Sequence, residues 1–487
     1  MSYILVLDIG TSSIRASVVT KNQDVEATLQ TEFLPISPSP GLVEFDPVEM
    51  AKISIDSMNK IIDDRGVPLG IGITNQRAST ILWNKKTGLP LANGIGWQDL
   101  RTIGECLMLQ SKGIRLAPNH SATKIASILG ATGSTSFENI AFGTIDSWIV
   151  FNLTKNSSNP QHVSDWSNAS LTGLLNEQGS SYDDEISEAL KLDSAIFPKL
   201  VDSRGHLGEA SALTGSPPIL AILGDQQASL FGQRCFNVGD AKVTFGTGGM
   251  LDLVVGKSRP LFRVQGSNGT TPVIARTENS ESIWAIESIM LTAGSCIEWL
   301  RDGLKIINTS QDSHIEASKC TSSDDVWFVP ALMGLGAPVW DLGARGTLIG
   351  ITRGTGIPQI ARAVLEGIAH RGADLLYAAQ SDGDVEIKTL KVDGGMSRNP
   401  TFVQALANSC QKEIHVSSQT EATTLGVGLL AGLEANLFNS FDELCDNENN
   451  LTNTQIYYPT GFDNRERWLF VREKALKTVL ELSDINF

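Results

Sequence analysis

The chain has 487 residues, of which 41% are hydrophobic and 19% charged, and its formal net charge is −16. This length is too great for one hydrophobic core and predicts two large domains, while the negative charge argues against nucleic acid or an anionic membrane as a partner. Six scattered cysteines without a Cys-x-x-Cys pair, and no apolar run of about 18 residues, predict a cytoplasmic protein with reduced thiols and neither signal peptide nor membrane span.

The N-terminal segment has the pattern of a strand, a glycine turn and a returning strand. An apolar run from Tyr3 ends at Asp8, and the chain turns through Gly10-Thr11-Ser12-Ser13 into a β-rich run that carries Arg15. Such a turn lets backbone N–H groups and hydroxyls approach phosphate oxygens. It is neither a Walker A loop, which the chain lacks, nor a dinucleotide fingerprint, because a strand follows it instead of a helix. The pattern therefore predicts a phosphate-binding hairpin.

Polar side chains follow the next two predicted strand ends. Gly70 to Thr74 is typical of a buried strand, and Asn75-Gln76-Arg77 and Trp97-Gln98-Asp99 stand where ligands bind in α/β folds. An arginine beside a tryptophan suits a hydroxylated substrate, since one supplies donors and the other an apolar wall. Taken singly, a surface arginine and a core tryptophan are the alternative.

The middle of the chain repeats the N-terminal pattern. The apolar run Ile219 to Leu223 leads to Asp225, and a later pair of strands is joined by Gly246-Thr247-Gly248-Gly249. We interpret the pattern as a catalytic base and a second phosphate turn facing one cleft, with a helix cap and a plain hairpin as the alternative. Two copies of the pattern suggest two related halves around a nucleotide, with a hinge near residues 237–241.

The second half also contains predicted helices. Ile360, Val364, Ile368 and Leu375 share one face of a helix from Pro358 to Tyr377. Another helix is predicted to begin at Pro400, and a third to carry Leu425, Leu429 and Leu433.

Taken together, the motifs resemble the FGGY family of carbohydrate kinases along nearly the whole chain. The resemblance implies an α/β fold with two actin-like, RNase H-like domains, residues 1–238 and 239–487, and an active site in the cleft between them. It also implies ATP-dependent phosphorylation of a small polyol or sugar, with Mg²⁺. The motifs that carry it include DIGTSSIR, GITNQR, GWQDLRT, GDQQASLFGQ, TFGTGG and VDGGMSRNPTFVQALA.

The resemblance assigns roles to individual residues. Asp225 becomes the general base that accepts the proton of the acceptor hydroxyl, because a neutral hydroxyl is a poor nucleophile. Asp8 and Asp225 are expected to orient Mg²⁺, with a turn cap as the alternative for Asp8. An N-cap before Pro400 is the alternative for Asn399. The ATP phosphates are assigned to Thr11, Ser12, Ser13, Arg15, Gly246 and Thr247, the adenosine to Gly294, Glu298, Gly395, Met396 and Asn399, and the acceptor to Arg77, Ala78, Trp97, Asn119, Asp225 and Gln226.

Two positions depart from the pattern of the family members that phosphorylate glycerol. Ala78 stands in place of a glutamate, and Asn119 in place of a tyrosine. We expect Arg77 to lack its neighbouring counter-charge, which would leave the pocket positive and slightly larger. The resemblance makes glycerol the first expected acceptor, whereas the two departures favour the alternative, which is another polyol, a ketose or a sugar acid.

Two further hypotheses keep the fold without the catalysis. One is a nucleotide switch of the actin and Hsp70 type, which would need neither Asp225 nor the pocket with Arg77 and Trp97. The other is a degenerate kinase retained as a regulatory protein. For the kinase we expect a small-molecule partner, no nucleic acid or membrane partner, and a homodimer or homotetramer.

Overall fold

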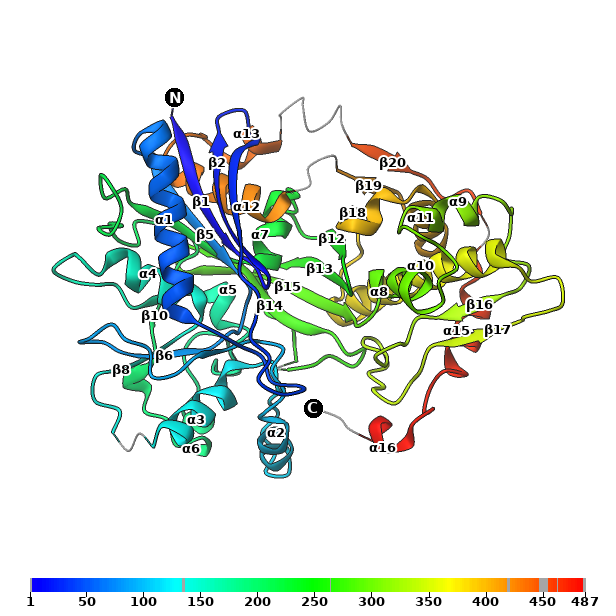
Figure 1. Ribbon diagram of the computed structural model, residues 1–487, viewed down its shortest axis with the longest axis horizontal. Helices are drawn as coiled ribbons and strands as arrows, with labels where there is room; N and C mark the ends of the chain where they lie inside the picture. The colour runs from blue at the N-terminus through cyan, green and yellow to red at the C-terminus, as the bar shows by residue number, and fades with distance from the viewer. Residues whose placement is uncertain are drawn as a thin grey trace.

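The computed structural model describes residues 2–133, 136–262, 264–417, 421–445, 454–461 and 463–484. Two α/β domains lie side by side, and each is built around one large sheet (Figure 1).

The sheet of the first domain places three strand ends along one edge. Its strand order is β11-β5-β1-β2-β3. Strands β1, β2 and β3 pair antiparallel, one after the other. Strands β5 and β11 run parallel to β1, so β1, β5 and β11 all end at the same edge of the sheet. The predicted strands and the N-terminal hairpin are confirmed. The bounds are β1 (Tyr3–Ile9), β2 (Ser13–Thr20), β3 (Val25–Glu32), β5 (Gly70–Asn75) and β11 (Ile219–Gly224).

Helices cover both faces of this sheet. Helices α1 (Pro47–Arg65) and α4 (Ile145–Thr154) pack on one face, and α7 (Asp225–Gly232) and α12 (Ala422–Glu434) on the other. Helix α12 comes from the second half of the chain, yet its apolar side lies against the first sheet (Figure 1). A Cβ at Gly426 would lie 1.8 Å from the Ala228 carbonyl oxygen, so glycine lets α12 and α7 approach backbone to backbone.

The second sheet repeats this arrangement. Its order is β14-β15-β13-β12-β18-β19-β20, in which β13 and β12 are antiparallel and β18 runs parallel to β12. The helices predicted from Pro358 and Pro400 are confirmed as α10 (Ile357–Gly383) and α11 (Pro400–Cys410). The sheet strands are β12 (Asp240–Phe245), β13 (Gly249–Gly256), β14 (Thr271–Glu278), β15 (Glu281–Met290), β18 (Thr389–Asp393), β19 (Ile414–Val416) and β20 (Gln455–Tyr457).

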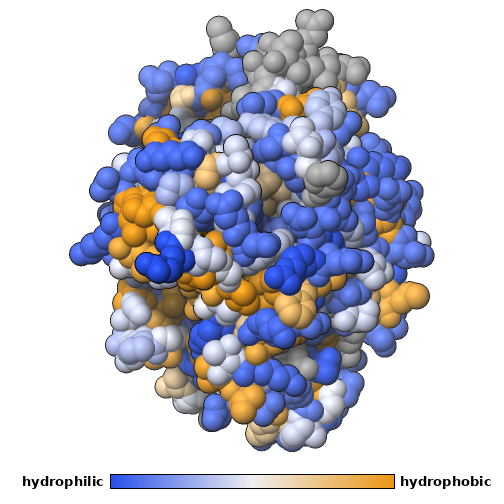
Figure 2. Space-filling model, turned by 90° about the vertical axis from the view of Figure 1, so that its right-hand side faces the viewer, coloured by the Kyte–Doolittle hydropathy of each residue, from blue (hydrophilic) through white to orange (hydrophobic). Residues whose placement is uncertain are grey.

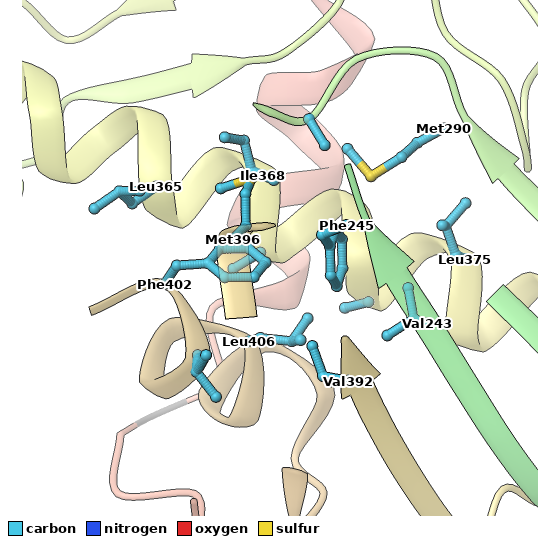
Figure 3. Close-up of a cluster of buried hydrophobic side chains, with 14 of the residues drawn as sticks. Val243, Phe245, Met290, Leu365, Ile368, Leu375, Val392, Met396, Phe402 and Leu406 are labelled. Atoms are coloured by element: carbon cyan, nitrogen blue, oxygen red, sulfur yellow. The ribbon is translucent and has the colours of Figure 1, made fainter. Parts of the chain in front are cut away.

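A buried cluster lies between this sheet and its helices, directly below the second glycine turn. Phe245, the last residue of β12, packs edge-on against Phe402 of α11 with ring centroids 4.8 Å apart. Met290 lies near Phe245, and Met396 lies near Phe402 (Figure 3). The end of β12, where the turn begins, is therefore held by a dense core.

The remaining elements connect and extend the two domains. The face of the molecule on the right in Figure 1 is mainly hydrophilic, with apolar side chains among the charged ones (Figure 2). Within the described ranges, no helix is long and apolar enough to cross a membrane. The elements are β4 (Glu44–Phe45), β6 (Ile81–Asn84), β7 (Gly94–Ile95), β8 (Ile140–Gly143), β9 (Val163–Asp165), β10 (Lys199–Val201), β16 (Trp327–Val329), β17 (Thr347–Ile349), α2 (Ile103–Gln110), α3 (Ser121–Thr132), α5 (Trp166–Ala169), α6 (Asp184–Ala189), α8 (Gly294–Glu298), α9 (Asp312–Ala317), α13 (Phe441–Cys445), α15 (Arg465–Glu473) and α16 (Leu480–Ser483).

One buried carboxylate fastens α15 to α10. Asp374 of α10 is fully buried and pairs with Arg371 of its own helix and with Arg465 and Arg472 of α15, at 2.5, 2.5 and 3.1 Å. The Trp468 indole also donates to Asp374, at 3.2 Å. Burial alone would raise the pKa of Asp374, but the three guanidinium groups hold it below its ordinary value.

Candidate active site

The catalytic candidate Asp225 stands at the edge where β1, β5 and β11 end. It is the first residue of α7, and its side chain is 31% exposed. Its Oδ1 accepts a hydrogen bond from the Gln226 amide at 2.8 Å and lies 3.3 Å from Arg77 Nε. Burial raises the pKa of Asp225, against the opposing effect of Arg77. A carboxylate that is accessible and more basic than usual is suited to accept a proton from a hydroxyl.

Asp8 lies at the end of β1, close enough to Asp225 for their charges to interact. Burial raises its pKa to about 6, opposed by Arg15 and a hydrogen bond from Thr424, and the charge of Asp225 adds to the rise. Two acidic side chains whose charges interact at one sheet edge fit a divalent cation. In the described part of the chain, no three or more His, Cys, Asp or Glu side chains gather into a metal cage. Two carboxylates match Mg²⁺, which takes its other ligands from water and phosphate.

The first glycine turn adjoins the predicted acceptor pocket. The Gly10 amide donates to the Ser13 carbonyl at 3.0 Å, which closes the turn and leaves Ser12 exposed. Thr11 donates to Gln76 at 3.2 Å and accepts from the Trp97 indole at 3.5 Å. The hairpin assigned to phosphate is thus in direct contact with Trp97, which is assigned to the acceptor, and with Gln76, the neighbour of Arg77. Arg15 forms an ion pair with Glu421, ahead of α12, and lies 3.9 Å from Asp8.

The expectation that Arg77 lacks a counter-charge is wrong. Its Nη2 lies 2.7 Å from Oε2 of Glu287, a residue of β15 that is only 2% exposed. The missing carboxylate at position 78 is thus replaced from the other domain. The expected positive pocket is also wrong, because Arg77 and Lys242 face three carboxylates. These are Asp225, Asp252 and Glu287, so the cluster carries one excess negative charge.

Ala78 occupies a tight turn. Its φ is +59°, and the Ser79 amide donates to the Arg77 carbonyl at 2.8 Å, which makes Ala78 the central residue of a γ-turn. Ser121 donates to the Ala78 carbonyl at 3.0 Å and fixes the turn. The side chain is 3% exposed and belongs to an apolar cluster between the domains that includes Leu171. Ala78 is therefore packed among apolar side chains instead of facing open space, contrary to our expectation of a larger pocket.

A buried lysine that the sequence interpretation missed joins two pocket segments. Lys124 of α3 is fully buried, and its Nζ donates to the carbonyls of Trp97 and Asn119 at 3.1 and 3.3 Å. Burial lowers its pKa to about 7, opposed by Asp99. Lys124 is the one charged residue of α3 (Ser121–Thr132), and this was the signal for its role.

Replacing Lys124 with methionine should raise the KM for the acceptor by several-fold, up to about 10-fold, because two carbonyl groups lose their buried donor. The KM for ATP should stay unchanged, since both hydrogen bonds of Lys124 go to segments assigned to the acceptor. Steady-state kinetics with each substrate varied in turn measures the effect. Lys112→Met, which alters an exposed lysine after α2, is the control. An unchanged acceptor KM in Lys124→Met would contradict the role.

Backbone hydrogen bonds join the second glycine turn to the start of α8. The Gly294 amide donates to the Gly246 carbonyl at 2.9 Å, and a Cβ at Gly294 would lie 2.6 Å from that oxygen. The Ala293 and Ser295 amides donate to the Thr247 carbonyl. The structure therefore brings residues assigned to phosphate and to adenosine together, with Gly246 and Thr247 exposed.

The other residues assigned to adenosine have mixed surroundings. Glu298 is exposed on α8, and Gly395 is exposed after β18. Met396 is 7% exposed and packs in the core, so only its backbone is suited to line a ligand site. Asn399 caps α11 by accepting from the Phe402 amide at 3.1 Å and donates to Ser313 at 3.1 Å. The capping alternative for Asn399 is thus realised, and contact with adenosine stays a prediction.

Comparison with protein families agrees with this geometry. Residues 3–232 match the N-terminal domain of the FGGY family of carbohydrate kinases, and residues 241–435 match its C-terminal domain. Among curated proteins, the glycerol kinase of Vibrio parahaemolyticus is 38% identical over 466 residues, which cover 91% of each chain. Glycerol kinase 2 of Sulfolobus acidocaldarius is 39% identical over 459 residues, with the same coverage.

Solved structures share the two-domain architecture. A crystal structure of Plasmodium falciparum glycerol kinase with ADP superimposes with a TM-score of 0.89 at 28% identity, covering 100% of this chain and 99% of that one. A ligand-bound xylulose kinase from Lactobacillus acidophilus has a TM-score of 0.82 at 21% identity, which shows the fold alone. The predicted two-domain fold is confirmed.

Proposed function

Since the chain belongs to the FGGY family of carbohydrate kinases, we propose that it transfers the γ-phosphoryl group of ATP to a hydroxyl group of glycerol. The observation that carries this proposal is the 37–39% identity to several glycerol kinases over 91% of the chain. A nucleotide switch or a regulatory protein is not favoured by these relatives.

In this reaction Asp225 accepts the proton of the attacking hydroxyl. Arg77 and Gln226 lie beside it and are suited to bind the oxygens of the acceptor, while Trp97 offers an apolar surface to its carbons. Mg²⁺, held by Asp8 and Asp225, would neutralise charge on the phosphates. The phosphates themselves are assigned to the two glycine turns.

The charge of the pocket favours an uncharged acceptor. With three carboxylates against two cations, a sugar acid would bring a further negative charge next to Asp225 and Glu287. Like charges that lie close together in a partly buried site repel strongly. A neutral polyol avoids this repulsion, which supports glycerol over a sugar acid.

The acceptor is tested with a coupled assay of ADP release over glycerol, erythritol, xylitol, xylulose and gluconate. Glycerol should have the highest kcat/KM, and gluconate should be the poorest acceptor. ADP release without any acceptor is the background control. A higher kcat/KM for a ketose, or none for any acceptor, would contradict the proposal.

Other sequence predictions fit this function and are proposed with it. They are a cytoplasmic location, a homodimer or homotetramer, and a hinge near residues 237–241 between domains of residues 1–238 and 239–487. Helix α12 crosses that division, because it packs on the first sheet.

A further inference from the structure

Three charged residues of the second sheet form a transverse row. Lys242 of β12, Asp252 of β13 and Glu287 of β15 are register partners on adjacent strands. They are 0%, 2% and 2% exposed. Charges this deeply buried are costly unless each one has a partner.

The two ends of this row reach residues of the first domain. Glu287 Oε2 lies 2.7 Å from Arg77 Nη2, and Lys242 Nζ donates to Gln226 Oε1 at 2.5 Å. In the middle, Asp252 Oδ2 lies 3.0 Å from Lys242 Nζ. The row thus holds the two acceptor-binding side chains that flank Asp225.

Without Glu287, the carboxylate within reach of Arg77 on its own domain would be that of Asp225. Its Nε already lies 3.3 Å from Asp225 Oδ1, so an Arg77 without Glu287 could turn fully onto the catalytic base. That would occupy the base and withdraw donors from the acceptor. On its own domain Arg77 also donates from Nη1 to the neutral Gln227 Oε1 at 3.4 Å. Since position 78 carries no carboxylate, the second carboxylate that anchors Arg77 is Glu287, across the domain interface.

We propose that Glu287 is a positioning residue, which holds Arg77 for the acceptor and away from Asp225, and that Lys242 does the same for Gln226. The inference rests on the proposed function and adds to it: the acceptor pocket is complete only when the second sheet contacts the first domain. Binding of the acceptor is thereby coupled to the contact between the two domains.

The test is Glu287→Gln, assayed with glycerol and ATP varied separately. The KM for glycerol should rise by about 10- to 100-fold, the loss expected for one hydrogen bond to a charged group, and kcat should fall. The KM for ATP should not change. A merely structural role would lower the amount of active enzyme but leave both KM values as in the wild type, and that result would overturn the proposal.

Two further variants sharpen the test. Glu287→Asp keeps the buried charge and withdraws it by one methylene, so it should fold and give an intermediate glycerol KM; it carries the test if Glu287→Gln does not fold. Glu281→Gln, on the same strand in an exposed pair with Lys257, should behave as the wild type. A glycerol KM at the wild-type value in Glu287→Asp and Glu287→Gln would refute the role. Inactive wild type would instead refute the proposed function.

Discussion

Asp225→Asn should lower kcat by about 10²- to 10⁴-fold while glycerol and ATP still bind, because the amide cannot accept the proton of the attacking hydroxyl. Asparagine has the same shape and retains an oxygen that can accept from the Gln226 amide. The fold should therefore be unchanged. Turnover is measured by ADP release, and binding of each ligand by calorimetry.

The control for this variant is Asp384→Asn. Asp384 is exposed after α10, and its φ of +49° is a conformation that asparagine tolerates well. It should leave turnover unchanged. Near-normal turnover in Asp225→Asn would exclude the general-base role, and loss of ligand binding would show that Asp225 acts mainly in binding.

Asp374→Asn should destabilise the protein by about 3–5 kcal/mol, because it removes a buried carboxylate that pairs with the buried Arg371 and the half-buried Arg465 and Arg472. Asp374 has a depressed pKa in the folded state, so it stabilises the protein above the ordinary aspartate pKa. This stabilisation is lost as the pH falls through the folded-state pKa. The measurement is the inactivation temperature of wild type and variant at neutral and at acidic pH. The difference between the two proteins should become smaller as the pH is lowered.

The matched control is Asp302→Asn, which removes an exposed carboxylate paired with its neighbour Arg301. A solvated pair of this kind contributes little to stability. Equal inactivation temperatures for Asp374→Asn and Asp302→Asn would show that α15 does not depend on the buried cluster.

Local patterns were sufficient to predict the strands, the two glycine turns and the place of Asp225. Each of these features is marked by residues close together in the chain: an apolar run marks a strand, a glycine marks a turn, and a carboxylate marks the strand end. Asp8 and Asp225 could be placed together because parallel strands end at one edge.

The partners across the domain interface could not be predicted in this way. Glu287 stands in the run WAIESIM, whose apolar residues on either side of it indicate only a buried strand. Its contact with Arg77 depends on strand register and on how two sheets face each other, and neither has a local signal. For the same reason the expected positive pocket was wrong, since Asp252 and Glu287 lie 175 and 210 residues after Arg77 in the chain.

Helix α12 also determines how the two domains are tethered. The chain passes between them after α7, again between β19 and α12, and again between α13 and β20. A single protease cut in any one of these passages would leave the others intact, so the nicked halves should stay associated. Conversely, a fragment ending at residue 238 would keep α7 but lack α12, so part of one apolar face of its sheet would be uncovered. Expressed alone, it should aggregate, and adding a peptide that spans residues 421–445 should rescue its solubility.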